Sequence, residues 1–479
     1  MTKADHGYAN PLTVRYASPA MQSTFSAYNR GRLWRKLWAA LAESEHELGF
    51  PVSAEQVAEL KSNIDVVDLE AVARYESESR HEVMAHIRAW GEVCPKAAPI
   101  IHLGATSAFV MDNSDILQAA EALQRIENQL VHVLFQLRNR AQQLKDLPVL
   151  GYTHFQPAQL TTFGKRICMW AQDFLWDLLA VRRFLSDLPF LGMKGATGTA
   201  ASVVALCDGD TDKALKLDRL VAQKLGFKRL LTIAGQTYTR KLDCDIYHLL
   251  ASIAQSSSKM AHDMRLMQHT GEAMEPFRGK QVGSSAMPYK RNPMASERVC
   301  ALARHLISLA ANGYHTASTQ WLERSLDDSA NKRISIPEAF LTADSILHHV
   351  HDIAAGFEVV PGRIRAEIDR NLPFIATENI LMAAVKAGGN RQELHERIRE
   401  HSIAASRRIM DGASDNDLLS RLASDEAFAG IVGMLDRHLD PSAYIGLAPK
   451  QVEIFIAQEL DPALPLELPA FPWDREVKV

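Results

Sequence analysis

The sequence has 479 residues, a length that exceeds one compact hydrophobic core and predicts two or three domains. Its formal net charge of -4 disfavours general nucleic-acid binding, and its 47% hydrophobic and 23% charged content is typical of a water-soluble globular protein. Residues 1–11 lack the apolar stretch of a signal peptide, and no apolar run is long enough to cross a membrane. The five scattered cysteines favour a reducing cytoplasm over a disulfide framework or a zinc site.

The N-terminal part of the chain is expected to be helical after an irregular arm. Pro11 and Pro19 interrupt any regular element at the start. Apolar residues then recur at helical spacing over 29–48, and helical patterns continue over 54–90. A stretch rich in Gly, Pro, Ser and Thr follows, and it predicts the end of a first helical domain that covers residues 1–110.

The middle of the chain consists mainly of long helical patterns. They cover residues 114–147, 161–187 and 241–268, a stretch that begins near 296, and residues 333–356. A helix of about thirty residues spans roughly 45 Å, and helices of this length are typical of a bundle. Because alternating strand patterns are few, we predict an all-α fold. A bundle domain, residues 111–360, is followed by a C-terminal helical domain, residues 361–479, which ends in a Pro-rich tail.

Three polar segments, residues 151–159, 283–293 and 323–333, lie between the long helical patterns. The second of them contains Pro288 and Pro293, which exclude a regular helix or a central strand, together with two hydroxyls and a cationic pair. A polar loop held between rigid helices is a common place for catalytic groups. An arbitrary loop of this composition is nevertheless more often a solvated surface loop.

The loop 283–293 carries the pattern Gly-Ser-Ser-x-Met-Pro-x-Lys-x-Asn-Pro, which resembles the signature of the fumarase/aspartase superfamily. Members of that superfamily cleave C–N or C–O bonds and release fumarate. Tyr289 and the cationic pair after it make the loop similar to that of one family within the group, the adenylosuccinate lyases. The similarity extends over nearly the whole chain.

This resemblance implies an activity and an assembly. Adenylosuccinate lyases release fumarate from adenylosuccinate, which gives AMP, and from the succinyl-aminoimidazole-carboxamide ribotide of purine synthesis (SAICAR, giving AICAR). The resemblance also implies a three-domain fold and a homotetramer whose central long helices form a helical core, with each active site drawn from three chains. The implied partner is a small-molecule substrate, a purine nucleotide bearing a succinyl group. Neither a metal ion nor an organic cofactor is implied.

Elimination of fumarate needs a base for a weakly acidic proton, an acid for the departing nitrogen, and cations for the carbanion. His154 can serve as the acid, whereas Ser284 is a base only as an alkoxide, so the residues alone favour a histidine or carboxylate as the base. The resemblance implies instead that Ser284 is the general base and His154 the general acid. It also assigns to the site His81, which assists, Lys290 and Glu297. Glu297 is expected to orient His154.

Further positions match substrate-binding residues of that family. Those expected to hold the phosphate, ribose and carboxylates are Arg15, Tyr16, Arg298, Arg324, Ser329 and Arg333. Those expected to hold the succinyl part and the base are Thr106, Ser107, Thr153 and Gln236. One departure is Glu82, which stands where the family usually has Asp, so that the charge is kept but displaced by one methylene.

Other interpretations stay open. The chain could be another fumarate-releasing lyase, such as an argininosuccinate lyase, or a structural member of the superfamily without catalysis. The signature around Tyr289 argues against the first, and the presence of both His154 and Ser284 argues against the second. A metal site at the histidines 348, 349 and 351 is disfavoured, because no cysteine or carboxylate pattern joins them.

Overall fold

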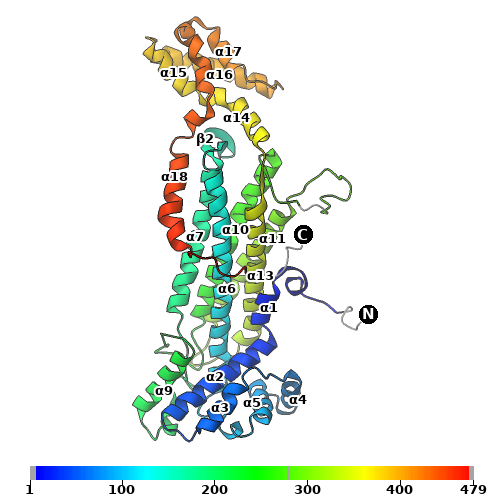
Figure 1. The fold of residues 1–479 in the computed structure, drawn as a ribbon, viewed down its shortest axis with the longest axis vertical. Helices are drawn as coiled ribbons and strands as arrows, with labels where there is room; N and C mark the ends of the chain where they lie inside the picture. The colour runs from blue at the N-terminus through cyan, green and yellow to red at the C-terminus, as the bar shows by residue number, and fades with distance from the viewer. Residues whose placement is uncertain (1–6, 278–280, 474–479) are drawn as a thin grey trace.

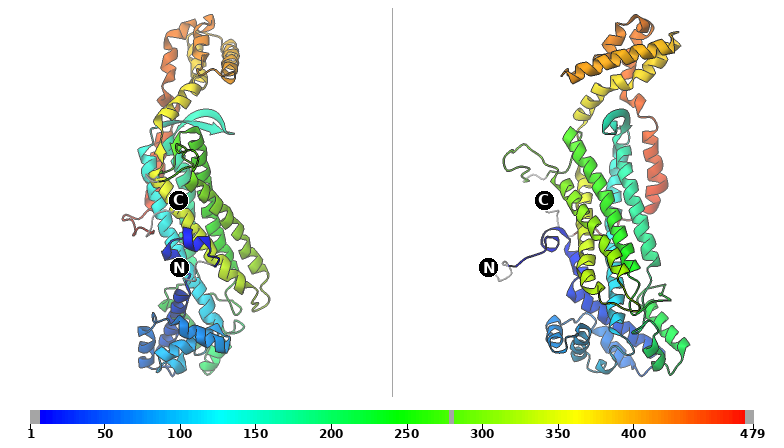
Figure 2. Two further views of the ribbon diagram at one scale, coloured as in Figure 1. Left: turned by 90° about the vertical axis from the view of Figure 1, so that its right-hand side faces the viewer. Right: turned by 180° about the vertical axis from the view of Figure 1, so that it is seen from behind.

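The computed structural model describes residues 7–277 and 281–473. The start of the N-terminal arm, 1–6, and the end of the Pro-rich tail, 474–479, lie outside the described residues. Figures 1 and 2 show an elongated molecule in which long helices run side by side through the middle, with N-terminal helices at one end and C-terminal helices at the other. This architecture confirms the predicted all-α fold with a central long-helix bundle. Within the described ranges, no helix is both long and apolar enough to span a bilayer.

The long helices of the bundle are all present where they are predicted. They are α6 (Ser107–Gln143), α7 (Phe163–Asp187), α10 (Lys241–Thr270), α11 (Met294–Leu309) and α13 (Asp328–Gly356), with the short α12 (Ala311–Ser318) between the last two. Two of them begin earlier than predicted. Helix α6 already buries Phe109 and Val110 in its first turn, and the first turns of α13 bury Asp328 and Lys332.

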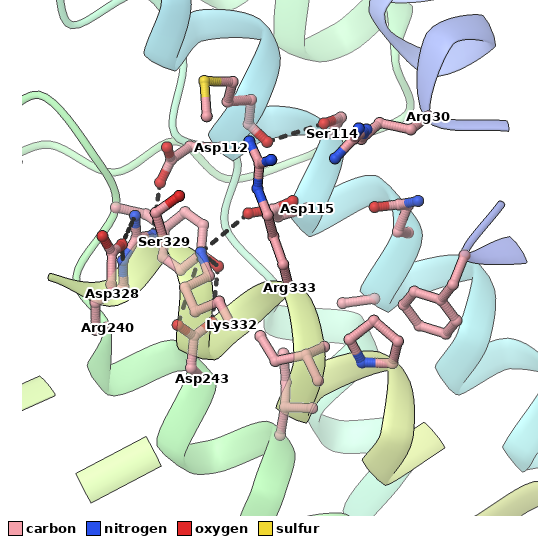
Figure 3. Close-up of a pocket in the computed structure, with 18 of the residues that line it drawn as sticks. Arg30, Asp112, Ser114, Asp115, Arg240, Asp243, Asp328, Ser329, Lys332 and Arg333 are labelled. Atoms are coloured by element: carbon pink, nitrogen blue, oxygen red, sulfur yellow. Dashed lines mark hydrogen bonds and ion pairs between the residues drawn. The ribbon is translucent and has the colours of Figure 1, made fainter. Parts of the chain in front are cut away.

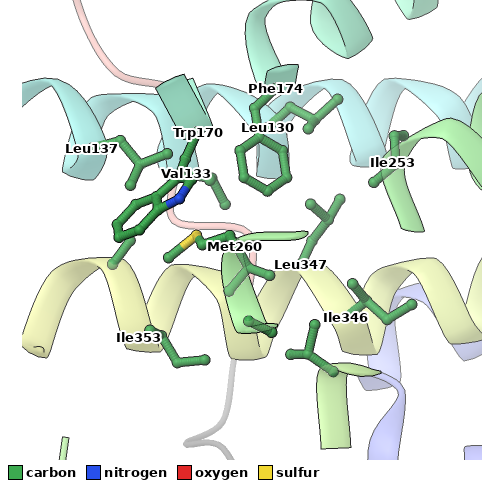
Figure 4. Packing of buried hydrophobic residues seen from close by; sticks show 14 of the residues in the cluster. Leu130, Val133, Leu137, Trp170, Phe174, Ile253, Met260, Ile346, Leu347 and Ile353 are labelled. Carbon is green, nitrogen blue, oxygen red and sulfur yellow. The ribbon is translucent and has the colours of Figure 1, made fainter. Parts of the chain in front are cut away.

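The apolar stripes of these helices meet in one large core (Figure 4). Leu130 and Leu137 of α6 pack with Trp170 of α7, Met260 of α10 and Leu347 of α13. Each of these side chains is at most 1% exposed. Since burial of one large apolar side chain contributes roughly 1.5–3 kcal/mol, the bundle is a rigid support for the segments at its two ends.

The N-terminal end is more regular than predicted. Its elements are η2 (Leu12–Tyr16), α1 (Pro19–Thr24), α2 (Ala27–Glu47), α3 (Ala54–Ser62), α4 (Leu69–Ser79), α5 (Glu82–Val93) and η3 (Ala98–Ile100), joined by α8 (Ala201–Leu206) and α9 (Thr211–Lys224). Pro19 starts α1 instead of breaking a helix, because the first helical position tolerates proline. Helices α8 and α9 lie where no helix is predicted. Leu217 of α9 and Trp38 of α2 are buried in the same core.

The C-terminal end has a small core of its own, which includes Leu394, Leu418 and Phe428. It is built from α14 (Pro361–Ile375), α15 (Thr377–Lys386), α16 (Arg391–Met410), α17 (Leu418–Ala423), η4 (Glu426–Leu439) and η5 (Pro441–Tyr444). The chain then returns along α7 through α18 (Ala448–Phe455), η6 (Ile456–Leu460) and α19 (Asp461–Ala463). Its tail packs against α13, where Trp473 stacks on His348 with ring centroids 4.9 Å apart.

Two short antiparallel strand pairs depart from the prediction. Strand β1 (Pro148–Thr153) pairs with β2 (Gln156–Thr162), and β3 (Ala273–Met274) pairs with β4 (Glu358–Val359). The segment 151–159, predicted as a loop, therefore forms a hairpin with a two-residue turn at His154 and Phe155. Both residues have positive φ, 52° and 56°, as such tight turns require. The hairpin is not predicted from the sequence because its turn lacks the usual Asn-Gly pair.

A close approach between the end of α6 and the start of α7 holds the base of this hairpin. Gly164 N donates to Leu144 O at 2.9 Å, and Phe163 N donates to Leu147 O at 2.9 Å. A Cβ on Gly164 would lie 2.5 Å from the carbonyl oxygen of Ala141, a backbone atom that has little freedom to move. Glycine is therefore required at this position.

We expect Gly164→Ala to lower the free energy of unfolding by about 1–3 kcal/mol, because the two backbone segments must separate. Gly362→Ala in α14 is the matched control, since a Cβ at Gly362 meets nothing within 4 Å. Alanine at such a helical position is neutral or slightly stabilising. Urea denaturation followed by circular dichroism measures both variants. A Gly164→Ala protein as stable as wild type would show that the helices are not in this close contact.

Candidate active site

The hairpin turn carries His154 at one end of the bundle. The side chains of His154 and Thr153 are exposed, and the φ of 52° at His154 is a left-handed conformation that costs a non-glycine residue about 1–3 kcal/mol. Tyr152 of β1 donates a 3.4 Å hydrogen bond to Glu272, which follows α10. The hairpin is thus attached to the C-terminal end of α10. Backbone strain at an exposed histidine is a feature that clusters at active sites.

The signature loop, residues 283–293, projects sideways from the bundle just before α11 (Figures 1 and 2). The amide of Asn292 donates to Gly283 O at 2.7 Å and closes the loop at its base. A Cβ on Gly283 would lie 2.1 Å from Lys290 O, so a larger residue does not fit. The side chains of Lys290 and Glu297, the latter on the first turn of α11, are exposed.

Ser284 lies half-buried at the start of the signature loop, next to the exposed Ser285. Its Oγ accepts hydrogen bonds from the backbone N–H groups of Ala286 at 3.3 Å and Met287 at 3.1 Å. Two amides that point at one oxygen stabilise negative charge on it. This geometry supplies part of what an alkoxide base requires.

Arg298 of α11 joins a second group of predicted binding residues. Its guanidinium lies 5.5 Å from the ring centroid of Tyr16 in η2, and its Nη1 donates to His349 Nε2 at 3.2 Å. Burial and, to a smaller extent, the charge of Arg298 lower the pKa of His349 to about 3. This imidazole is therefore neutral and accepts the hydrogen bond. Burial also lowers the pKa of Arg298, and the neighbouring charge of Arg15 contributes in the same direction. Two arginines whose charges act on each other suit an anionic group of a substrate.

A cavity of about 380 Å³ lies at the opposite end of the bundle, between α2, α6, α10 and α13 (Figure 3). Three of the predicted binding residues line it: Arg324, Ser329 and Arg333. Its charged and polar lining also includes residues that are not among the predicted site residues, namely Arg30, Asp112, Asp115, Tyr238, Arg240, Asp243, Asp328 and Lys332. Tyr238 and Arg240 stand within four positions of the predicted Gln236 in the sequence, and that proximity is a signal from which both could be inferred.

Four other predicted residues lie at the starts of elements or in the segment before α10. His81 caps α5, and its Nδ1 accepts a 3.3 Å hydrogen bond from a backbone amide of that helix. Thr106 and Ser107 begin α6, and helix N-termini attract anionic groups. Gln236 N donates to Glu323 O at 2.9 Å, which ties Gln236 to the segment that contains Arg324.

Glu82 connects α5 to the cavity. Its carboxylate forms ion pairs with Arg30 of α2 and, at 2.8 Å, with Arg333 of α13. The position that departs from the family's usual Asp therefore contacts a predicted substrate-binding arginine. Its side chain is 17% exposed, against 50% for Arg333, so the carboxylate is the more buried partner of the pair.

A single chain does not bring the predicted catalytic and binding residues into one site. The loop that carries Ser284 is attached near the C-terminal end of α10, where Gln268 Nε2 donates to Arg291 O at 2.9 Å, and the hairpin of His154 is attached at that end too. The cavity lies at the N-terminal end, beside Arg240. The 30 residues of α10 separate these ends by about 45 Å, which is longer than a nucleotide.

Comparisons with known proteins define the class. A family model described as "Lyase" matches residues 14–307. The crystal structure of 3-carboxy-cis,cis-muconate lactonizing enzyme from Pseudomonas putida is 24% identical, with a TM-score of 0.81 over 95% of this chain and 100% of that chain. The crystal structure of a fumarate lyase from Mesorhizobium sp. BNC1 is 23% identical, with a TM-score of 0.79 over 94% of this chain and 100% of that chain. The fold is that of the fumarase/aspartase superfamily of lyases.

Closer relatives define the family within that class. A second family model, described as "Adenylosuccinate lyase C-terminus", matches residues 373–455. The adenylosuccinate lyase of Saccharomyces cerevisiae is 49% identical over 460 residues, which are 95% of each chain. That of Schistosoma mansoni is 47% identical over 459 residues, which are 95% of this chain and 96% of the relative. The chain belongs to the adenylosuccinate lyase family.

Proposed function

We propose that this protein cleaves adenylosuccinate to AMP and fumarate, and SAICAR to AICAR and fumarate. The observation that carries the proposal is the 49% identity to a relative of that name over 95% of both chains. The relative from Schizosaccharomyces pombe, 45% identical over 96% of both chains, supports it as well. The family's C-terminal match over residues 373–455 distinguishes this proposal from a general lyase assignment.

The proposed reaction is an anti β-elimination. Ser284, as an alkoxide, removes a proton from Cβ of the succinyl group, and the resulting carbanion is stabilised as a doubly charged carboxylate. The C–N bond then breaks, its electron pair stays on the nitrogen, and His154 donates a proton there as fumarate leaves. The two amides that donate to Ser284 Oγ support its role as the base, and Lys290 of the same loop supplies positive charge.

The remaining predicted residues are proposed to bind the substrate. Arg324, Ser329 and Arg333 line one cavity, whereas Tyr16 and Arg298 form a separate contact to which Arg15 adds its charge. The nucleotide carries a phosphate and two carboxylates, so more than one cationic group is needed. Thr106, Ser107 and Gln236 lie near the cavity end of the bundle, and with Thr153 they are proposed to hold the succinyl part and the base. His81 is proposed to assist catalysis at the substrate, and Glu297 is proposed to orient His154.

We further propose a homotetramer in which each active site takes residues from three chains. The separation of about 45 Å along α10 supports this, because one nucleotide cannot contact both ends of the bundle in one chain. Exposed apolar side chains on the long helices support it too. On α7, Met169 is 52% exposed and Trp176 is 64% exposed, and large exposed apolar groups favour protein interfaces.

The domain boundaries at residues 110 and 360 and the cytoplasmic location also stay proposals. Separate apolar cores at the two ends support a division into three domains. The N-terminal core additionally includes Phe190 and Leu217 from the segment after α7. The chain therefore contributes to the N-terminal domain again after the proposed boundary at residue 110.

Turnover of adenylosuccinate tests the proposed function directly. Purified protein is mixed with adenylosuccinate, ultraviolet absorbance follows the loss of substrate, and fumarate is quantified separately. We expect one fumarate for each AMP formed and no turnover of argininosuccinate. Turnover of argininosuccinate alone would favour the rival lyase. A folded oligomer that turns over neither succinyl compound would indicate a structural member of the superfamily.

Shortening Glu82 is expected to weaken substrate binding more than catalysis. In Glu82→Asp the carboxylate is withdrawn by one methylene and loses its 2.8 Å contact with Arg333. We expect KM for adenylosuccinate to rise about threefold with little change in kcat, because Arg333 is no longer held in place. Glu92→Asp is the control, since Glu92 of α5 pairs with Arg74 at 3.0 Å on an exposed surface. A KM equal to that of wild type would mean that Glu82 does not orient Arg333.

A further inference from the structure

Arg240 is a buried cation to which the proposed mechanism gives no role. It directly precedes α10 and is 3% exposed. Its Nη1 donates to Asp112 Oδ1 of α6 at 2.6 Å, and its Nε donates to Asp328 Oδ2 of α13 at 2.6 Å. Figure 3 shows these groups together at the cavity. One side chain thus joins the N-terminal turns of three helices.

Asp328 extends this connection to a predicted binding residue. Its second oxygen, Oδ1, accepts a hydrogen bond from Arg324 Nη1 at 2.8 Å. Asp328 is 1% exposed and Asp112 is 3% exposed. Burying such charges is costly unless each is paired in good geometry. These ion pairs therefore form a fixed chain that ends at the substrate-binding side, in the order Asp112, Arg240, Asp328 and Arg324.

The three segments that Arg240 joins, at the starts of α6, α10 and α13, also carry the predicted binding residues of this end of the molecule. Gln236 N donates to Glu323 O at 2.9 Å, next to Arg324 in the sequence. A Cβ on Gly235 would lie 2.4 Å from Glu323 O, so the two backbones are in direct contact there. Residues 235–240 are thus fixed to residues 323–328 at both ends, by backbone at one end and by Arg240 at the other.

We propose that Arg240 is a positioning residue for substrate binding, which fixes the guanidinium of Arg324 through Asp328. The inference rests on the proposed function, because Arg324 is expected to contact the nucleotide. A purely structural ion pair would affect stability and the active fraction. A positioning residue additionally changes the affinity for the nucleotide, and it does so only while Arg324 is present.

A double-mutant cycle separates these two roles. Arg240→Met, Asp328→Asn and Arg324→Ala are compared singly and in pairs, with KM for adenylosuccinate, the dissociation constant for AMP and the Tm measured for each. The matched control is Lys194→Met, because Lys194 and Asp218 form a largely buried ion pair, with 2.8 Å between Nζ and Oδ2, and neither residue lines this cavity. We expect Asp328→Asn and Arg240→Met each to raise KM and the AMP dissociation constant about tenfold, with kcat much less affected. In the Arg324→Ala background the further rise should be below about twofold, since coupled groups are non-additive.

Each outcome decides the inference. Lys194→Met is expected to lower the Tm without changing KM, which shows what loss of a buried pair does alone. If Arg240→Met does not fold, Asp328→Asn and Gly235→Ala carry the same comparison. Additive effects of Asp328→Asn and Arg324→Ala, or a lower Tm with unchanged KM and AMP affinity, would overturn the positioning role. A wild-type protein that binds AMP but does not turn over adenylosuccinate would contradict the proposed function while the AMP affinities still test Arg240.

Discussion

Replacing Ser284 with alanine is expected to reduce kcat for adenylosuccinate about a thousandfold, a typical effect of removing a general base. The variant removes the oxygen that takes the proton from Cβ, and it keeps the backbone amides of Ala286 and Met287 that surround that oxygen. The Tm should change little, because Ser284 is only half-buried and the loop is closed elsewhere, by Asn292.

Ser285→Ala is the matched control for this variant. It makes the same chemical change one position along the signature loop, at an exposed side chain, and it should keep most of the activity. Fumarate release and far-ultraviolet circular dichroism are measured on the same preparations. Near-normal turnover of Ser284→Ala, or an equal loss in Ser285→Ala, would remove Ser284 from the role of base.

The second large effect is expected for His154→Asn, with kcat lowered by about 10²- to 10⁴-fold. Asparagine is chosen because it tolerates the left-handed backbone, so the φ of 52° and the hairpin turn can persist. What is lost is the imidazole proton that the departing nitrogen requires. KM should change much less than kcat, since His154 is proposed to act on the leaving group rather than to anchor the nucleotide.

His395→Asn tests whether loss of any exposed histidine has a similar effect. His395 lies on α16 at the C-terminal end, and its side chain is exposed like that of His154. It should leave kcat unchanged. A His154→Asn enzyme with wild-type kcat, in a protein whose circular dichroism is unaltered, would rule out His154 as the acid.

The long helices can be predicted from the sequence because their apolar stripes are long and regular. The hairpin cannot, because His154 and Phe155 adopt positive φ without the Asn-Gly pair that signals such a turn. Helix α9 is an intermediate case. Its buried residues Ala214, Leu217 and Val221 do recur at helical spacing, so a closer inspection of that stretch would detect it.

The predicted site residues come from sequence motifs, whereas the ion pairs behind them depend on tertiary contacts. The charged segment 323–333 gives no indication that Asp328 and Lys332 are buried. Asp328 meets Arg240, which is 88 positions away in the chain, and Lys332 meets Asp115, which is 217 positions away. Pairings at such separations have no local sequence signal, and neither does the separation of about 45 Å between the two ends of the bundle.

Each active site is proposed to take residues from three chains, and the resemblance to the family implies that the segments of His154 and Ser284 come from two of them, although both segments are attached at the same end of α10 in one chain. This division is tested by mixing the two inactive variants, Ser284→Ala and His154→Asn, dissociating them, and allowing them to reassemble. If the two residues of one site come from different chains, about one site in four of an equal random mixture contains both native side chains, and activity should recover toward that fraction. If each chain supplied both residues to its own site, the reassembled mixture would stay as inactive as the separate variants, and the proposed division of His154 and Ser284 between chains would be wrong.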